Sequence, residues 1–222
     1  MIGFYDYTVI LTYCSVISAV AGISLVLTGG NPYIAVYLLM LSGLCDAFDG
    51  RVARRKKNRT DQMKAFGIQI DSLADLAAFG ILPVCIGMAL RGKLYTEVGG
   101  FQLPGVLVTT ISCLYILAAI IRLAYYNVTE EERQSVEGGT RKYYVGLPVT
   151  SASLIFPTVV LIERFIPGNG IWLYYAIMLM VAAGFVGNFR LRKPGFKAIL
   201  VMVAIGAVEA LVFLLVRMLT NG

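Results

Sequence analysis

The chain has 222 residues, of which 58% are hydrophobic and only 14% are charged, and its mean hydropathy is +0.77. Long apolar stretches alternate with short polar breaks, which excludes a soluble globular domain and predicts helices that satisfy their own backbone polar groups in lipid. The net charge of +6 comes from basic residues at the ends of apolar stretches, which argues against a nucleic-acid partner and favours contact with membrane lipid.

The apolar stretches predict an all-α fold, a polytopic transmembrane helical bundle of about seven spanning helices, with six to eight as the range. The predicted helices cover roughly residues 8–28, 33–56, 66–90, 104–127, 145–165, 171–189 and 196–218. The first stretch follows a segment without basic residues, so we expect a mature helix and not a cleaved signal peptide. We expect one integral membrane domain over residues 1–222.

The loops predict the orientation of the chain. Basic residues cluster at 51–59, 133–142 and 190–197, after the predicted second, fourth and sixth helices. Cytoplasmic loops carry an excess of lysine and arginine, so these loops and the N-terminus should face the cytoplasm. The longest polar segment, at 128–144, is predicted to be a loop on this side. We therefore expect a multi-pass protein of the cell membrane.

Four aspartates lie at one end of the predicted second and third helices. Asp46 and Asp49 are three residues apart, and Asp71 and Asp75 are four apart, so each pair shares one helix face. If the two helices are antiparallel neighbours, the two pairs lie opposite each other. Acidic side chains in or near lipid are costly and usually functional.

Carboxylates that converge in this way repel one another unless a positive group lies among them. Carboxylate oxygens favour Mg²⁺ or Mn²⁺, with Ca²⁺ as another occupant, and a pair of such ions stabilises phosphate oxygens during displacement. The chain has no histidine, so a general base must be a carboxylate, lysine, tyrosine or water. The plainer alternative is that the aspartates are helix-end charges paired with Arg51 and Arg54.

These residues stand in a recognisable order. The sequences Asp46-x-x-Asp49-Gly50-x-x-Ala53-Arg54 and Gly67-x-x-x-Asp71-x-x-x-Asp75 resemble the signature of the CDP-alcohol phosphotransferases. Those integral membrane enzymes displace CMP from a CDP-linked alcohol with a second alcohol. The segment between the two halves is about four residues longer than usual in the family, which is about one helical turn.

The resemblance covers about residues 8–165, the expected catalytic core, with its signature at 46–75. It implies that Asp46, Asp49 and Asp71 hold two divalent cations, and that Asp75 is both a further metal ligand and the base for the incoming hydroxyl. It also implies a nucleotide site, for which the candidate residues are Thr12, Gly50, Ala53, Arg54 and Gly67.

Three further segments resemble phosphatidylserine synthases: IDSLADLAAFGILP at 70–83, RLAYYN at 122–127 and GLP at 146–148. Serine needs a cation for its carboxylate and an acceptor for its ammonium group. The candidate serine-binding residues are Arg122, Asn127, Arg141 and Lys142. The alternatives are that Arg122 extends to lipid headgroups, that Asn127 ends a helix, and that the loop cations only set the topology.

The sequence therefore predicts transfer of the phosphatidyl group from CDP-diacylglycerol to L-serine, with phosphatidylserine and CMP as products, at the cytoplasmic face. One alternative is a member of the same family whose acceptor is glycerol 3-phosphate or an inositol phosphate. Another, from a different class, is a divalent-cation transporter. The resemblance also implies a homodimer.

Overall fold

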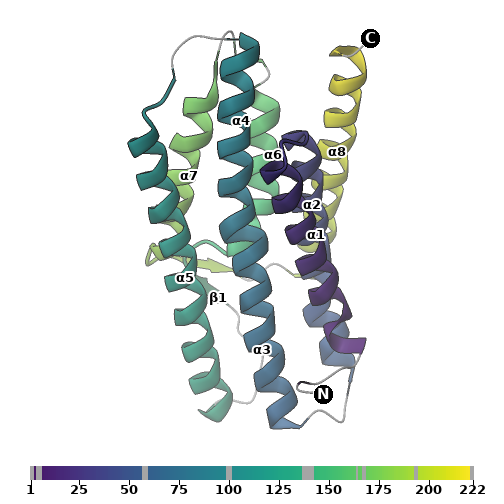
Figure 1. Ribbon diagram of the computed structural model, residues 1–222. Helices are drawn as coiled ribbons and strands as arrows, with labels where there is room; N and C mark the ends of the chain where they lie inside the picture. The colour runs from purple at the N-terminus through teal and green to yellow at the C-terminus, as the bar shows by residue number, and fades with distance from the viewer. Residues whose placement is uncertain are drawn as a thin grey trace.

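The computed structural model describes residues 3, 7–56, 60–98, 102–136, 143–163, 165–166, 169–192 and 195–220, and these form a bundle of long helices (Figure 1). The helices are α1 (Ile10–Leu27), α2 (Pro32–Arg55), α3 (Asp61–Asp75), α4 (Leu82–Val98), α5 (Gly105–Val136), α6 (Ala152–Glu163), α7 (Ile171–Val186) and α8 (Phe196–Thr220). Short 3-10 turns precede α1 and α6, at Tyr7–Val9 and Val149–Ser151. A π-helix, Leu76–Ile81, joins α3 to α4 in one continuous rod.

Several of these helices are long and apolar enough to cross a membrane. The five such segments are Tyr7–Leu27, Pro32–Ala53, Asp61–Thr96, Gly105–Thr129 and Phe196–Leu215. Two shorter apolar helices lie at Val149–Glu163 and Ile171–Val186. Since α3 and α4 form one rod, the described part of the chain confirms the prediction of an all-helical membrane bundle with about seven helices.

Several predicted boundaries were wrong. The third helical rod begins at Asp61 and not at residue 66, and it continues to Val98 and not to residue 90. Residues 128–136 continue α5, although the sequence predicted a loop there. The physical reason is that hydropathy marks where apolar sequence ends, whereas a helix can continue into water with polar side chains. Thr129 illustrates this, because its hydroxyl donates back to the carbonyls of Tyr125 and Tyr126.

Local signals fix where the two aspartate-bearing helices begin. The Asn31 side chain caps α2 by accepting the Tyr33 N–H, and Pro32 occupies the first turn, where its missing N–H costs nothing. The Thr60 hydroxyl caps α3 by accepting the Met63 N–H at 3.2 Å. These caps fix the first residues of α2 and α3, and therefore the helix faces on which Asp49 and Asp71 lie.

Helices α1 and α2 are antiparallel and pack closely along small side chains. The Ser18 hydroxyl donates to the Leu38 carbonyl at 2.8 Å, and the Ser42 hydroxyl donates to the Ser15 carbonyl at 3.1 Å. Side chain to backbone bonds of this kind require close approach, which small residues allow in membrane helices. The same antiparallel alignment of α1 and α2 places Thr12 of α1 beside the acidic residues of α2.

The helix α8 packs mainly against α2 and α6 at the edge of the bundle, where Figure 1 shows it in yellow. Only 6% of its most apolar stretch is buried within the described structure. The Phe213 ring lies 5.7 Å from that of Tyr33 and 5.5 Å from that of Tyr37. One turn before Phe213 on α8, the Glu209 carboxyl accepts a hydrogen bond from the Thr158 hydroxyl. A few specific contacts therefore hold a helix that is otherwise exposed.

The chain also forms a two-stranded antiparallel sheet that the sequence did not predict. Strand β1 (Tyr143–Val145) pairs with β2 (Arg190–Arg192), and Val145 lies opposite Arg190. Gly146 follows at φ +73° and donates its N–H to the Phe189 carbonyl at 2.8 Å. The sheet thus joins the α5–α6 connection to the α7–α8 connection.

We expect Gly146→Ala to destabilise the protein. A Cβ at Gly146 would lie 2.8 to 3.2 Å from the carbonyl oxygens of Phe185, Gly187 and Gly184, and the positive φ disfavours any side chain. Together these effects should cost about 2 kcal/mol or more of folding free energy. The loss should appear as a lower unfolding midpoint of the detergent-solubilised protein. Gly92→Ala is the matched control, since a Cβ there meets nothing within 4 Å, and equal midpoints for the two variants would contradict the argument.

Candidate metal centre

Three carboxylates meet between α2 and α3. One oxygen each from Asp46, Asp49 and Asp71 lies within 4.8 Å of the other two, and Asp49 is only 7% exposed. Oxygens that share one Mg²⁺ at about 2.1 Å lie at most about 4.2 Å apart, so small side-chain rotations would close the group around an ion. The donor set fits a hard divalent cation.

The fourth aspartate adjoins this group of three. Asp75 lies one turn after Asp71, and its carboxyl contacts that of Asp46, while the carboxyl of Asp71 contacts that of Asp49. Like charges make such pairwise contacts only when a proton or a cation lies between them. The structure therefore brings the four aspartates together from two facing helices, in the arrangement that their spacing predicted.

The first helix reaches the same place. Thr12 is buried and its hydroxyl donates to Asp49 Oδ2 at 3.4 Å. The Gly50 N–H donates to the other carboxyl oxygen, Oδ1, of Asp49. Two donors thus fix the orientation of Asp49 before any ligand binds.

The other residues predicted to bind the nucleotide lie near the aspartates along α2 and α3. Gly50 and Ala53 follow Asp49 on α2, and Gly67 lies one turn before Asp71 on α3. Arg54 belongs to the last turn of α2, and its side chain lies outside the described part of the structure.

The alternative in which arginine neutralises the aspartates finds no support at Arg51. Within the described part of the chain, no ion pair joins Arg51 to a carboxylate. Its guanidinium carbon instead lies 4.4 Å from the ring centroid of Phe196 and 6.0 Å from that of Phe48. The Arg51 guanidinium therefore stacks on aromatic rings and does not pair with the aspartates.

Two of the predicted serine-binding residues lie on α5. The Asn127 side-chain oxygen accepts the Ser72 hydroxyl at 2.8 Å, and Ser72 directly follows Asp71. Arg122 is 6% exposed; its Nε donates to the Leu147 carbonyl at 3.1 Å, and its guanidinium carbon lies 5.2 Å from the Tyr126 ring. Arg122 is thus held inside the bundle and does not extend to lipid headgroups.

Arg141 and Lys142 lie outside the described residues. Sequence reasoning missed the contribution of Ser72, which has a visible signal: it stands between Asp71 and Asp75 in the segment IDSLAD.

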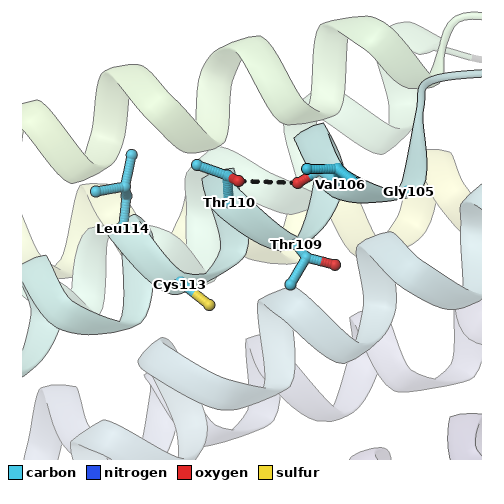
Figure 2. A pocket seen from close by; sticks show the side chains of 6 residues that line it. All are labelled: Gly105, Val106, Thr109, Thr110, Cys113 and Leu114. Carbon is cyan, nitrogen blue, oxygen red and sulfur yellow. Dashed lines mark hydrogen bonds between the residues drawn. The ribbon is translucent and has the colours of Figure 1, made fainter.

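Two surface hollows in the described part of the chain lie away from the aspartates. One of them, of about 590 Å³, lies along the first turns of α5, and Figure 2 shows the side chains that line it, from Gly105 to Leu114. The Thr110 hydroxyl there donates back to the Val106 carbonyl at 2.9 Å. A second, of about 450 Å³, adjoins the α1–α2 turn and Lys93. Neither includes an acidic residue, so the donor set, and not a cavity, identifies the site.

The sequence of the chain matches a known protein family. The family described as CDP-alcohol phosphatidyltransferase matches residues 8–186, which include all four aspartates and Asn127. The chain belongs to this family. The match confirms the prediction made from the signature, and the metal dependence of the family agrees with the acidic group of α2 and α3.

Individual relatives carry more specific names. A CDP-diacylglycerol–serine O-phosphatidyltransferase of Helicobacter pylori is 29% identical over 168 residues, covering 74% of this chain and 62% of the relative. One of Saccharomyces cerevisiae is 34% identical over 155 residues, covering 68% and 51%. An archaetidylserine synthase of Methanothermobacter thermautotrophicus is 32% identical over 125 residues, covering 56% and 45%. The chain therefore spans about half to three fifths of the length of these curated relatives.

Proposed function

We propose that the protein transfers the phosphatidyl group of CDP-diacylglycerol to the hydroxyl of L-serine and releases CMP. The observation that carries this proposal is the meeting of Asp46, Asp49 and Asp71 between two helices, with Asp75 in contact. Family membership supports the reaction type, and three relatives that are named as serine transferases or an archaetidylserine synthase support the acceptor.

Asp46, Asp49 and Asp71 would hold two divalent cations, Mg²⁺ or Mn²⁺. When bound, these ions neutralise charge on the diphosphate of the substrate and on the departing CMP. The Thr12 hydroxyl and the Gly50 N–H hold the Asp49 carboxyl in place. Preorganised ligands of this kind avoid a cost of reorientation during the reaction.

Asp75 is the proposed base. Its carboxyl accepts the proton of the serine hydroxyl while the serine oxygen forms a bond to the phosphorus attached to diacylglycerol. The bond from this phosphorus to the oxygen of CMP breaks, and CMP leaves with the electron pair. Asp75 suits this role because it adjoins the group of three without being one of them.

The acceptor pocket is proposed to lie between α3 and α5. Asn127 is tied to Ser72, so a molecule that Asn127 binds lies next to Asp71 and Asp75. Its side-chain oxygen accepts the Ser72 hydroxyl, which directs the amide N–H groups to serve as donors to the serine carboxylate. Arg122 provides positive charge five residues away on the same helix, and Arg141 and Lys142 are proposed to contribute from the following loop.

The membrane provides the rest of the arrangement. The acyl chains of CDP-diacylglycerol remain among the apolar helices while the headgroup reacts at the ends of α2 and α3. The basic residues at 51–59, in the last turns of α2 and the connection to α3, favour the cytoplasmic face for the site. The homodimer remains a prediction.

Release of CMP by the purified protein in detergent tests the proposal. The assay contains CDP-diacylglycerol, Mn²⁺ or Mg²⁺, and one acceptor at a time: L-serine, glycerol 3-phosphate, an inositol phosphate, or none. We expect release that requires L-serine. Release that requires one of the phosphorylated acceptors would overturn the serine pocket and keep the reaction type. No release with any acceptor, together with Mn²⁺ flux into sealed vesicles, would favour the transporter.

A further inference from the structure

The rod that carries Asp71 and Asp75 is irregular directly after Asp75. Leu76–Ile81 forms a π-helix, in which the Leu82 N–H bonds to the Ala77 carbonyl, five residues back. Single π-turns inside α-helices are rare and often accompany functional sites. Pro83 follows at once and cannot donate an N–H.

One carbonyl of this segment accepts a hydrogen bond from a side chain. In a regular α-helix the Phe79 carbonyl would accept the N–H of the residue four positions on, which is Pro83. The Tyr115 hydroxyl of α5 instead donates to the Phe79 carbonyl at 2.6 Å. Tyr115 and Phe79 are both 0% exposed. An α-helical turn at this point would leave the Phe79 carbonyl without an N–H donor, and the Tyr115 hydroxyl supplies one in the membrane interior, where water is not available.

The Tyr115 ring is itself firmly held. Its centroid lies 5.6 Å from that of Phe156 and 5.5 Å from that of Phe185. Twelve residues farther along α5, Asn127 accepts the Ser72 hydroxyl. Helix α5 therefore bonds to the rod on both sides of Asp75, at Ser72 and at Phe79.

The position of the π-helix decides where Asp75 points. One extra residue in a turn rotates the helix before it by about 100° relative to the helix after it. Beyond the π-helix, Leu82, Ile86 and Leu90 are at most 2% exposed and fix one face of α4 in the core. If the π-helix moved along the rod, the aspartates would turn away from α2 while these side chains stayed in place.

We propose that Tyr115 is a positioning residue whose hydroxyl fixes the π-helix and thereby holds Asp71 and Asp75 toward α2. The kinetic test of this inference rests on the proposed function, whereas the test by Mn²⁺ binding rests on the metal centre alone.

The test is a double-mutant cycle. Tyr115→Phe keeps the ring and removes the hydroxyl, and we expect kcat for CMP release to fall about tenfold, equivalent to about 1.4 kcal/mol, with KM for CDP-diacylglycerol little changed. Mn²⁺ affinity, measured from the EPR signal of the free ion, should fall by a similar factor. Pro83→Ala adds an N–H four residues after Phe79, where an α-helical turn can use it, so the double variant should recover most of both losses.

Tyr174→Phe is the matched control. The Tyr174 hydroxyl donates to the Pro83 carbonyl at 2.7 Å from an equally buried position. That carbonyl keeps a helix donor at Gly87, four residues on, so kcat and Mn²⁺ affinity should stay near those of the unmodified protein.

A loss in kcat or Mn²⁺ affinity that Pro83→Ala restores supports the inference. Unchanged values in Tyr115→Phe, a loss that Pro83→Ala fails to restore, or an equal loss in Tyr174→Phe would overturn it. The proposed function and the role of Tyr115 can fail separately. If the unmodified protein shows no serine-dependent CMP release, the Mn²⁺ affinities of the unmodified protein and of Tyr115→Phe still test the role of Tyr115. Gel filtration of each variant shows whether it is folded.

Discussion

Asp75→Asn is expected to lower serine-dependent CMP release by about 100- to 10,000-fold, since a positioned general base typically contributes 10²- to 10⁴-fold. The substitution keeps the size and shape of the side chain but removes the charge and the ability to accept the hydroxyl proton. It also alters the contact with Asp46 at the edge of the acidic group. Initial rates at saturating L-serine and Mn²⁺ measure the effect.

Asp61→Asn is the control for this experiment. Asp61 lies on the same rod, its side chain is 98% exposed, and it is bonded to Lys64 at 2.8 Å. An exposed pair of this kind contributes little to stability, so the rate should remain close to that of the unmodified protein. If Asp75→Asn retained a tenth or more of the activity, another group would have to be the base.

Removal of divalent cations should abolish CMP release altogether. Without a cation, the contacts among the carboxyl groups of Asp46, Asp49, Asp71 and Asp75 bring like charges together with nothing to offset them. Dialysis against a chelator followed by titration with Mn²⁺ or Mg²⁺ measures the requirement. Activity should return with the added ion.

Asp49→Asn gives this second prediction a residue-specific form. Asp49 is the most buried member of the group, and an amide oxygen is a weaker ligand than a carboxylate, so the half-saturating Mn²⁺ concentration should rise at least about tenfold. Asp61→Asn should leave it unchanged. Full activity in chelated protein that elemental analysis shows to be free of metal would contradict both expectations.

The acidic site could be predicted from sequence because its signal is local and chemically unusual. Asp46 and Asp49, and then Asp71 and Asp75, recur at helical spacing in apolar surroundings, and few structural roles require that pattern. The Thr12 hydroxyl bonds to Asp49, and the role of Thr12 in nucleotide binding remains a prediction. Its position depended on α1 and α2 being antiparallel neighbours, which a short connecting turn makes nearly certain in a helical bundle.

Other features depended on contacts between distant segments and left no local pattern. The pairing of β1 with β2 joins segments about 45 residues apart, and hydropathy carries no information about it. The burial of Arg122 against the Leu147 carbonyl depends on the path of the chain after α5. The π-helix changes the helical period over a single turn. The spacing of apolar residues cannot reveal so short a change, even though Pro83 lies next to it.

The slight burial of α8 bears on the order in which the protein assembles. The interior of the bundle is filled by α1 through α7, and α8 adds mainly an aromatic contact at Phe213 and a hydroxyl–carboxyl bond at Glu209. The ribosome delivers α8 after α1 to α7, so we expect the interior of the bundle to close in the membrane before α8 is inserted. Insertion of α8 and completion of the interior of the bundle would then be separate events, and α8 would dock onto a surface that has already formed.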